Sequence, residues 1–447
     1  MSKYAHDGSP HLASALVKWG RKYVFRGSGP SEFDKHVLTL FWGNALTGAI
    51  IFLSTPMLSR IYAPEDFGLL HAVFATTMLF NGASTLKYET AIVMAADEKE
   101  SMALASLSFL ILLTITLSVA LLLLAGDGYI VQLLKTDRLR PYYPIILVLL
   151  LFQGIGRIQS SLLIHQRAFR HFSLLNVVRV FFRQTIATAY GLVIIPHVRG
   201  LLSGRVVAEG MTCILVFLRY PSWLKQRHSF AQLQKLAVKY RQFPLIATAS
   251  QYVHTLTLHA HVFMILRFFD EEHAGYYTVA AALIEQSFGV ITGAVSNVYF
   301  KAASQAFQEK GALALRQVYL ATLKKTFIII VLPTVALIIG GTTLLPFFLG
   351  ETWHEAGKII RILAIWKFFE LVNRPVSATF AILNKQQILL YLRLFSLVLR
   401  FCSILAFHQT FTICMLALTC SASVHYILYT VIQYRYITRL LKENVPT

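Results

Sequence analysis

The sequence contains few carboxylates and few charged residues of any kind. Of its 447 residues, 21 are Asp or Glu and 41 are Lys or Arg, so the charged fraction is 14% and the formal net charge is +20. Hydrophobic residues make up 56% of the chain, and the mean hydropathy is +0.59. This composition excludes a soluble multidomain protein of this length, because so apolar a chain needs lipid as its solvent.

The apolar stretches lack the alternation of apolar and polar residues that a membrane β-barrel requires. The segments LSFLILLTITLSVALLLLA (107–125) and TFIIIVLPTVALIIG (326–340) are apolar on all sides. In hydrocarbon, the other structure that satisfies its own backbone polar groups is the helix. We therefore predict an all-α, polytopic integral membrane protein.

A cleavable signal peptide and a cysteine motif are also missing. The first ~35 residues are polar and basic, without a continuous apolar core, so we expect the amino terminus to stay in the cytoplasm. The cysteines have no paired or metal-ligand spacing, so we interpret them as small core residues and expect no metal site. All of them fall in apolar stretches: Cys213, Cys402, Cys414 and Cys420.

About twelve apolar segments are long enough to cross a bilayer core of ~30 Å. With a cytoplasmic amino terminus, the even-numbered loops and both termini hold most of the Lys and Arg, as cytoplasmic segments do. The basic charge is then explained by topology and by attraction to anionic headgroups, and we expect no nucleic acid partner. The predicted spans begin near Val37, Phe67, Ala103, Tyr142, Phe172, Leu201, Pro244, Gly275, Thr326, Ile359, Ile388 and Phe411.

The longest polar interruption divides these spans into six and six. We predict two six-helix bundles around a central cationic cavity, with both termini cytoplasmic. The basic amino-terminal arm is interpreted either as a surface-lying tail or as a contact for cytoplasmic glycosylation proteins. The predicted units are the arm (1–36), a first bundle (37–220), a cytoplasmic linker (221–243), a second bundle (244–437) and a cytoplasmic tail (438–447).

A short motif occurs once in each predicted half. LSRIYAPEDFG (58–68) ends the first span, and LRFFDEEHAGY (266–276) ends the seventh. This repeat predicts two halves of like orientation, related by an axis along the membrane normal, that can rock against each other. The acidic residues and Pro64 suit either a helix start or a gating contact. At one constant offset, Arg60, Glu65 and Gly68 fall on Arg267, Glu272 and Gly275.

Basic residues also lie inside the predicted spans, where an unpaired charge costs several kcal/mol, so each is a functional candidate. Helical spacing places Arg179 with Arg183 on one face, Arg393 with Arg400 on another, and Lys367, Glu370 and Arg374 on a third. Some of these residues are expected to form ion pairs or to snorkel, but the carboxylates are too few to pair them all. The candidates are Lys87, Arg157, Arg179, Arg183, Lys367, Arg374, Arg393 and Arg400, against Glu89, Glu209, Glu285 and Glu370.

A cationic interior suits a strongly anionic headgroup such as a phosphate or pyrophosphate. An exporter of cationic drugs is expected to show the opposite sign. We therefore assign the eight basic candidates to substrate binding, and Glu89, Glu285 and Glu370 to H⁺ or Na⁺ coupling or, as the rival interpretation, to internal ion pairs.

The motif LSRIYAPEDFG, followed by LKYETAIVM (86–94), resembles the start of the Wzx-type polysaccharide flippases. These belong to the superfamily that also contains the multidrug and toxin extrusion transporters and the lipid II flippases. The second half is similar to the family pattern around Phe243 and Pro244, at HAGYYTVAAAL (273–283) and from Val295 to Phe300. Lys87, Tyr88 and Glu89 match the family's basic-aromatic-Glu signature, whereas the arginines match by span and depth only.

The resemblance implies a transporter without enzymatic activity in a bacterial inner membrane. Such proteins move undecaprenyl-pyrophosphate-linked oligosaccharide from the cytoplasmic to the periplasmic leaflet by alternating access, for O-antigen and other surface polysaccharides. The implied partners are this lipid-linked cargo, membrane lipids and other polysaccharide assembly proteins, and we expect a monomer without a cofactor beyond a coupling ion.

Two other classes are weighed against this interpretation. A multidrug antiporter shares the architecture but not the net positive interior. A membrane-embedded polymerase or glycosyltransferase is expected to show a long periplasmic loop or a paired-Asp metal site, and the sequence has neither. The sequence also contains no GxxxxGK loop for ATP hydrolysis.

Overall fold

The computed structural model describes residues 32–129, 137–219, 228–383 and 385–443 of the 447-residue chain. Long helices dominate these residues, and none of them forms a strand. The expected amino-terminal arm lies almost entirely outside the described residues, as does the start of the expected linker. The all-α prediction is confirmed.

The first half consists of helices that reverse direction at short connections. The Asp97 carboxylate accepts a hydrogen bond from the backbone N–H of Glu100, which caps one of these helices. Pro64 occupies the first turn of another, as the sequence predicts. The elements are α2 (Glu32–Ile61), α3 (Pro64–Asn81), α4 (Tyr88–Val93), α5 (Glu98–Ala125), the 3₁₀ turn η1 (Arg140–Tyr142), α7 (Tyr143–His165), α8 (Phe169–Val193) and α9 (Val198–Arg219).

The second half repeats this pattern after a short amphipathic helix. The 79 residues of its longest helix include Gly311, whose φ of 72° and ψ of −162° break the helix into two arms. The elements are α11 (Phe230–Lys239), η2 (Phe243–Ala247), α12 (Thr248–Phe268), α13 (Glu271–Leu349), η3 (Glu351–Trp353), α14 (His354–Asn373), η4 (Arg374–Ala378), α15 (Thr379–Ile382), α16 (Gln386–Ala406) and α17 (Phe411–Glu443).

The helices satisfy the expectation of a multi-pass membrane protein. Seven of them are long and apolar enough to cross a bilayer by length and composition alone. Each of the twelve predicted span starts falls within, or within a residue of, a helical segment, with Gly275 and Thr326 on the two arms of α13. Helices such as α8 and α14 fall outside the seven because they carry several basic residues.

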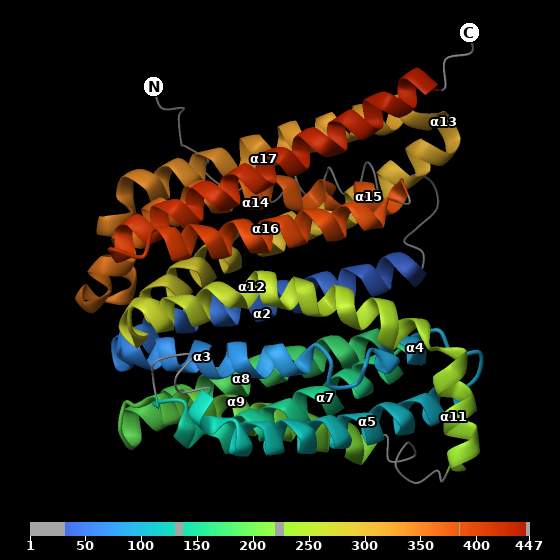
Figure 1. The fold of residues 1–447 in the computed structure, drawn as a ribbon, viewed down its shortest axis with the longest axis horizontal. Helices are drawn as coiled ribbons and strands as arrows, with labels where there is room; N and C mark the ends of the chain where they lie inside the picture. The colour runs from blue at the N-terminus through green and yellow to red at the C-terminus, as the bar shows by residue number, and fades with distance from the viewer. Residues whose placement is uncertain (1–31, 130–136, 220–227, 384, 444–447) are drawn as a thin grey trace, which may run out of the picture.

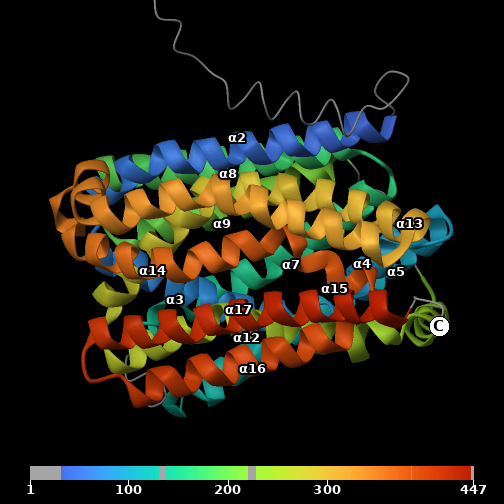
Figure 2. The same ribbon diagram turned by 90° about the horizontal axis from the view of Figure 1, so that it is seen from above.

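The long helices lie side by side with nearly parallel axes, and the short helix α11 runs across one end of them (Figure 1). Helices α5, α7, α8 and α9 form one side of the molecule, and α13, α14, α16 and α17 form the other. Helices α3 and α12 pack against each other between them, and α3 also packs on α13. Figure 2 shows the same arrangement turned by 90°.

The two repeated glycines lie where α3 crosses α13. A Cβ on Gly68 would lie 1.8 Å from the carbonyl oxygen of Glu271, and a Cβ on Gly275 would lie 1.9 Å from that of Pro64. The numbers 68 and 275 differ by 207, as do 64 and 271. Each half therefore contributes a glycine and a carbonyl group at equivalent positions of the repeated motif. Only glycine allows backbones to approach this closely.

Hydrogen bonds surround this crossing and join the halves further. The indole N–H of Trp353 donates to the carbonyl oxygen of Ser59 at 2.8 Å, and the Ser59 hydroxyl donates to that of Leu349 at 2.9 Å. Arg60 donates to the carbonyl oxygen of Phe347 at 3.2 Å. Trp353 and Ser59 are buried, so these bonds are protected from solvent.

Arg138 connects the halves at the rim of the same end. Its Nη1 lies 3.6 Å from the carboxylate of Glu65 on α3 and 3.5 Å from that of Glu271 on α13. The carboxylates that cap the two helices are Asp66 and Asp270, which accept the backbone N–H groups of Ala63 and His273. The repeated acidic segments therefore contain both capping residues and residues that reach across to the other half.

Other residues of the repeated motif do not take part in the crossing. The carboxylate of Glu272 accepts a hydrogen bond of 2.6 Å from the hydroxyl of Tyr276 on the next turn of α13. Arg267 lies in the last turn of α12.

The expectation that all cysteines are core residues is wrong for Cys402 and Cys420, which are exposed on α16 and α17.

At the opposite end, α11 packs on the first half. Lys239 donates a hydrogen bond to Glu100 on α5, and this bond raises the pKa of Lys239 above its ordinary value. The Tyr88 hydroxyl donates to the carbonyl oxygen of Ala237 at 3.0 Å. The connection between the halves is thus attached to the first half before α12 begins.

We predict that Gly68→Ala destabilises the protein by about 1–3 kcal/mol, because the added methyl group forces the α3 and α13 backbones apart. Thermal unfolding of the detergent-purified protein measures the effect. The control is Gly293→Ala on α13, where a Cβ meets nothing within 4 Å. This control is expected to be neutral or stabilising by up to about 1 kcal/mol. Equal melting temperatures for the two variants would contradict the close crossing.

Candidate functional site

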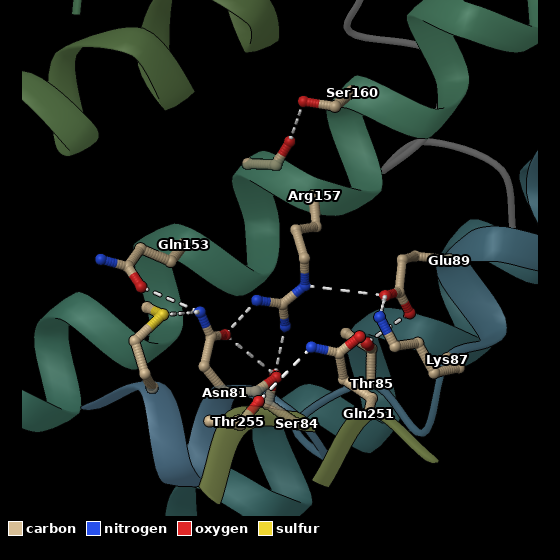
Figure 3. A network of polar contacts seen from close by, with 12 residues as sticks. Asn81, Ser84, Thr85, Lys87, Glu89, Gln153, Arg157, Ser160, Gln251 and Thr255 are labelled. Atoms are coloured by element: carbon tan, nitrogen blue, oxygen red, sulfur yellow. Dashed lines mark hydrogen bonds and ion pairs between the residues drawn. The ribbon is translucent and has the colours of Figure 1, made fainter. Parts of the chain in front are cut away.

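A polar network surrounds Arg157 of α7 (Figure 3). Its guanidinium donates to the side-chain oxygens of Asn81 and Ser84. Its Nε lies 3.7 Å from the carboxylate of Glu89. Glu89 is 5% exposed and also accepts a hydrogen bond from the Thr85 hydroxyl. Buried charges need this kind of pairing, so the network fixes Arg157 inside the first half.

A tight turn after α3 brings Glu89 back to Arg157. Leu86 and Lys87 have φ values of 48° and 62°, a region that non-glycine residues seldom adopt. The chain then enters α4, whose first turn carries Glu89. Lys87 lies 3.8 Å from the same carboxylate. The basic-aromatic-Glu signature of Lys87, Tyr88 and Glu89 therefore supplies the carboxylate that faces Arg157.

A second charge network lies in the other half. Both terminal nitrogens of Arg374 donate hydrogen bonds to the carboxylate of Glu285 on α13, and the longer of the two bonds measures 2.8 Å. Arg374 also donates to Glu370 at 3.0 Å, and Lys367 donates to Glu370 at 2.9 Å. A bidentate pairing of arginine with carboxylate is among the strongest polar contacts in proteins.

The two networks have the same construction. In each half, an arginine in or just after the fourth predicted span pairs with a glutamate in or just after the second predicted span. The pairs are Arg157 with Glu89 and Arg374 with Glu285. The side chains of Arg157 and Arg374 are 28% and 29% exposed, and Glu285 is 43% exposed. Both arginines can therefore be reached by a ligand, although no ion pair or hydrogen bond between described residues joins one network to the other.

A third basic group lies between α8 and α9. Arg179 is 3.3 Å from Glu209 and donates to Asn176. Arg183 follows on the next turn of α8, on the same face. Arg179 also lines a small hollow between α7, α8 and α9, together with Gln159, Ser160 and Thr212. This hollow lies inside the first half, whereas the expected cavity was between the halves.

Arg205 is a basic residue of this group that the sequence analysis missed. Its guanidinium carbon lies 4.3 Å from the centre of the Phe74 ring on α3. It stands four residues before Glu209 on α9, and the rule that selected Arg179 also applies to it.

The two arginines of α16 differ from those in the networks. Arg400 is 5% exposed and lies 4.6 Å from the centre of the Trp366 ring, whereas Arg393 is half-buried. Among the described residues, neither forms an ion pair with a carboxylate, and the same holds for Arg183 and Arg205. The expectation that carboxylates are too few to pair every basic side chain agrees with this arrangement.

The fold is shared with solved membrane transporters. The chain matches an inward-facing multidrug resistance MATE family transporter of the MOP superfamily with a TM-score of 0.71 at 14% identity, over 96% of this chain and 100% of that one. An outward-facing MATE family transporter of the MOP superfamily matches with a TM-score of 0.59 at 14% identity, over 91% and 96%. A MOP superfamily transporter from Pyrococcus furiosus, described as having a binding pocket of reverse polarity, matches with 0.60 at 15% identity, over 91% and 96%.

These likenesses and the paired internal charges define a polytopic membrane protein with the fold of the MOP superfamily transporters. The family profile of the polysaccharide biosynthesis proteins matches residues 57–358, which is more than half of the chain. The chain belongs to this polysaccharide biosynthesis protein family. A comparison with curated protein sequences gives no match.

We predict that Arg374→Gln destabilises the protein by about 1–3 kcal/mol, because Glu285 loses its ion pair and Glu370 keeps only Lys367. The double variant Arg374→Gln/Glu285→Gln is expected to recover part of this loss, and unfolding of all variants in detergent gives the coupling. The matched control is Lys358→Gln, which breaks an exposed ion pair with Glu355 and should cost less than about 1 kcal/mol. A loss for Arg374→Gln no larger than the control would contradict the network.

Proposed function

We propose that this protein moves a polyprenyl-pyrophosphate-linked oligosaccharide from the cytoplasmic to the periplasmic leaflet of a bacterial inner membrane. The observation that carries the proposal is the excess of basic over acidic side chains inside the bundle. A diphosphate carries the complementary charge and offers oxygens for bidentate arginine contacts. The family membership supports a role in making a cell-surface polysaccharide such as O-antigen.

The charge excess is visible in the groups described above. The three groups and α16 contain nine basic residues and four carboxylates. Because each carboxylate is already bound by at least one of the basic side chains, the excess leaves cations for an anionic ligand. The residues are Lys87, Arg157, Arg179, Arg183, Arg205, Lys367, Arg374, Arg393 and Arg400, against Glu89, Glu209, Glu285 and Glu370.

Arg157 and Arg374 are the proposed docking residues for the diphosphate. Each lies in one half, each is partly exposed, and each is paired with a glutamate. At Arg374 the exposed Glu285 is a carboxylate that a phosphate can replace. Arg179, Arg183, Arg393 and Lys367 extend the basic surface, and the lipid tail stays in the bilayer while the glycan stays in water. A diphosphate that replaces Glu285 at Arg374 frees a carboxylate to take H⁺ or Na⁺, which couples transport to an ion gradient.

The closed end of the molecule is the periplasmic one in the proposed orientation. The halves are joined at the Gly68–Gly275 crossing, which lies at the periplasmic side in the proposed orientation with both termini cytoplasmic. The higher TM-score with the inward-facing relative, 0.71 against 0.59 for the outward-facing one, supports a state open to the cytoplasm. A single chain contains both halves, so we propose a monomer.

A multidrug antiporter is the rival function, because the solved relatives include MATE transporters. Its cargo is cationic, and the basic interior of this chain opposes it. The relative from Pyrococcus furiosus is described as having a binding pocket of reverse polarity and a different function, so the fold accommodates interiors of more than one sign.

The direct test is to deplete the protein in its native cell and to locate the lipid-linked oligosaccharide with a membrane-impermeant glycan probe. Accumulation on the cytoplasmic face, with loss of surface polysaccharide, is expected. Accumulation on the periplasmic face would instead indicate a polymerase or a ligase. Unchanged glycan with altered drug sensitivity would favour the antiporter.

We predict that Arg157→Gln/Arg374→Gln abolishes surface polysaccharide export while the protein still inserts, because the cargo loses one guanidinium contact from each half. Export is measured by complementation of the depleted cells, and insertion by membrane fractionation. The matched control is Arg170→Gln/Arg435→Gln, which removes one exposed arginine from each half and should keep export. Full export by the first variant would overturn the docking assignment.

A further inference from the structure

Buried polar groups without partners gather in the second half, around Arg400. Within the described residues, no hydrogen-bond partner is found for Nε of Arg400, Nε1 of Trp366, Nδ1 of His261 or the hydroxyl of Ser396. All four side chains are at least nine-tenths buried. Buried polar groups are almost always hydrogen-bonded, so these groups indicate an additional ligand.

The four groups come from three neighbouring helices. The guanidinium carbon of Arg400 on α16 lies 4.6 Å from the centre of the Trp366 ring on α14. The ring centroids of Trp366 and His261 on α12 are 6.2 Å apart. Ser396 is one turn before Arg400 on the same face of α16. They therefore surround one region between α12, α14 and α16.

The protein itself provides Arg400 with almost no neutralisation. Apart from contacts with aromatic side chains, Arg400 forms one hydrogen bond to the described residues. It donates to the carbonyl oxygen of Thr257 at 3.5 Å. The nearby Tyr426 hydroxyl is a further neutral partner. Glu370 is already bound through one oxygen to Lys367 and through the other to Arg374. A buried cation left in this state costs several kcal/mol.

The ion-pair network beside Arg400, taken together with Arg400, has one positive charge in excess. Lys367, Arg374 and Arg400 are positive, whereas Glu285 and Glu370 are the carboxylates that face them. One monovalent anion would balance the set. The N–H groups of Arg400 and Trp366 and the hydroxyl of Ser396 are donors, which suit an anion and not a metal cation.

We propose that the second half contains a buried site for a small monovalent anion such as chloride, lined by Arg400, Trp366, His261 and Ser396. Its enclosure distinguishes it from the docking site for the cargo, because the Arg400 side chain is 5% exposed and a pyrophosphate joined to a lipid cannot enter. The bound anion holds α12, α14 and α16 together. The proposal does not rest on the proposed flippase function.

The test measures anion-dependent stability of the full-length protein purified in detergent. Thermal unfolding is followed while sodium chloride or sodium bromide replaces sodium gluconate at constant ionic strength. A ligand that binds only the folded protein raises the melting temperature as its concentration rises. We expect such a rise with chloride and bromide. Any rise with inorganic pyrophosphate, which the proposed docking site can bind, is expected to stay unchanged in Arg400→Gln.

The variants separate this site from a general effect of salt. Arg400→Gln is expected to weaken the apparent halide affinity by at least about tenfold, and Trp366→Phe, which keeps an aromatic ring but removes the N–H, to weaken it by less. Arg435→Gln, which removes an exposed arginine from α17 of the same half, is the control and should keep the halide response. If Arg400→Gln fails to fold, the halide response of Trp366→Phe still tests whether the anion binds at this site.

Three outcomes would overturn the proposal. One is an equal melting temperature in chloride and gluconate, which would mean that water alone fills the site. Another is a halide response that Trp366→Phe and Arg400→Gln leave unchanged. The third is a response to pyrophosphate that replaces the halide response, which would assign Arg400 to the cargo. Bromide positions in a crystal, located by anomalous scattering beside Arg400, would confirm the site directly.

Discussion

The arrangement of this bundle depends on the pairing of arginine with carboxylate inside lipid. An isolated guanidinium in hydrocarbon is too costly to keep, so a helix that carries one has to face a partner on another helix. Arg157 faces Glu89, and Arg374 faces Glu285 and Glu370. These contacts fix how α7 and α14 are rotated, and the apolar faces of both helices then pack around them.

The same pairing explains how a charged interior remains stable without cargo. Glu285 occupies the guanidinium of Arg374 with the geometry that a phosphate would use. Because Glu285 is 43% exposed, its replacement by another anion needs no opening of the core. Glu89 and Glu370 are far more buried, so they serve to hold the basic side chains in position. Within the Arg374 network, exposure therefore separates the contact that can exchange from the one that cannot.

Hydropathy was enough to predict the helices, because the apolar stretches are local features of the sequence. The repeated motif predicted two similar halves, but not that its glycines bring α3 and α13 into backbone contact. The pairing was harder to predict, since Glu89 reaches Arg157 only through a turn with positive φ at Leu86 and Lys87. Arg205 was not among the predicted candidates, and its contact with Phe74 depends on how α9 faces α3. Burial was also harder to predict than helix formation. Cys402 and Cys420 lie in apolar stretches but are exposed, because a helix in lipid can direct apolar residues outward.

The contact between the halves combines close backbone approach with apolar packing. At the Gly68–Gly275 crossing the two backbones meet, and the surrounding hydrogen bonds of Ser59 and Trp353 contribute about 0.5–1.5 kcal/mol each. The ion pairs of Arg138 are partly exposed and add less. Side chains of both halves also share one buried apolar cluster, in which the ring centroids of Phe67 and Trp353 lie 5.3 Å apart. Opening this end therefore separates apolar surface as well as breaking hydrogen bonds, and differential binding of a ligand to the two states has to offset both. The repetition of glycine in both halves lets each half form one side of the same contact.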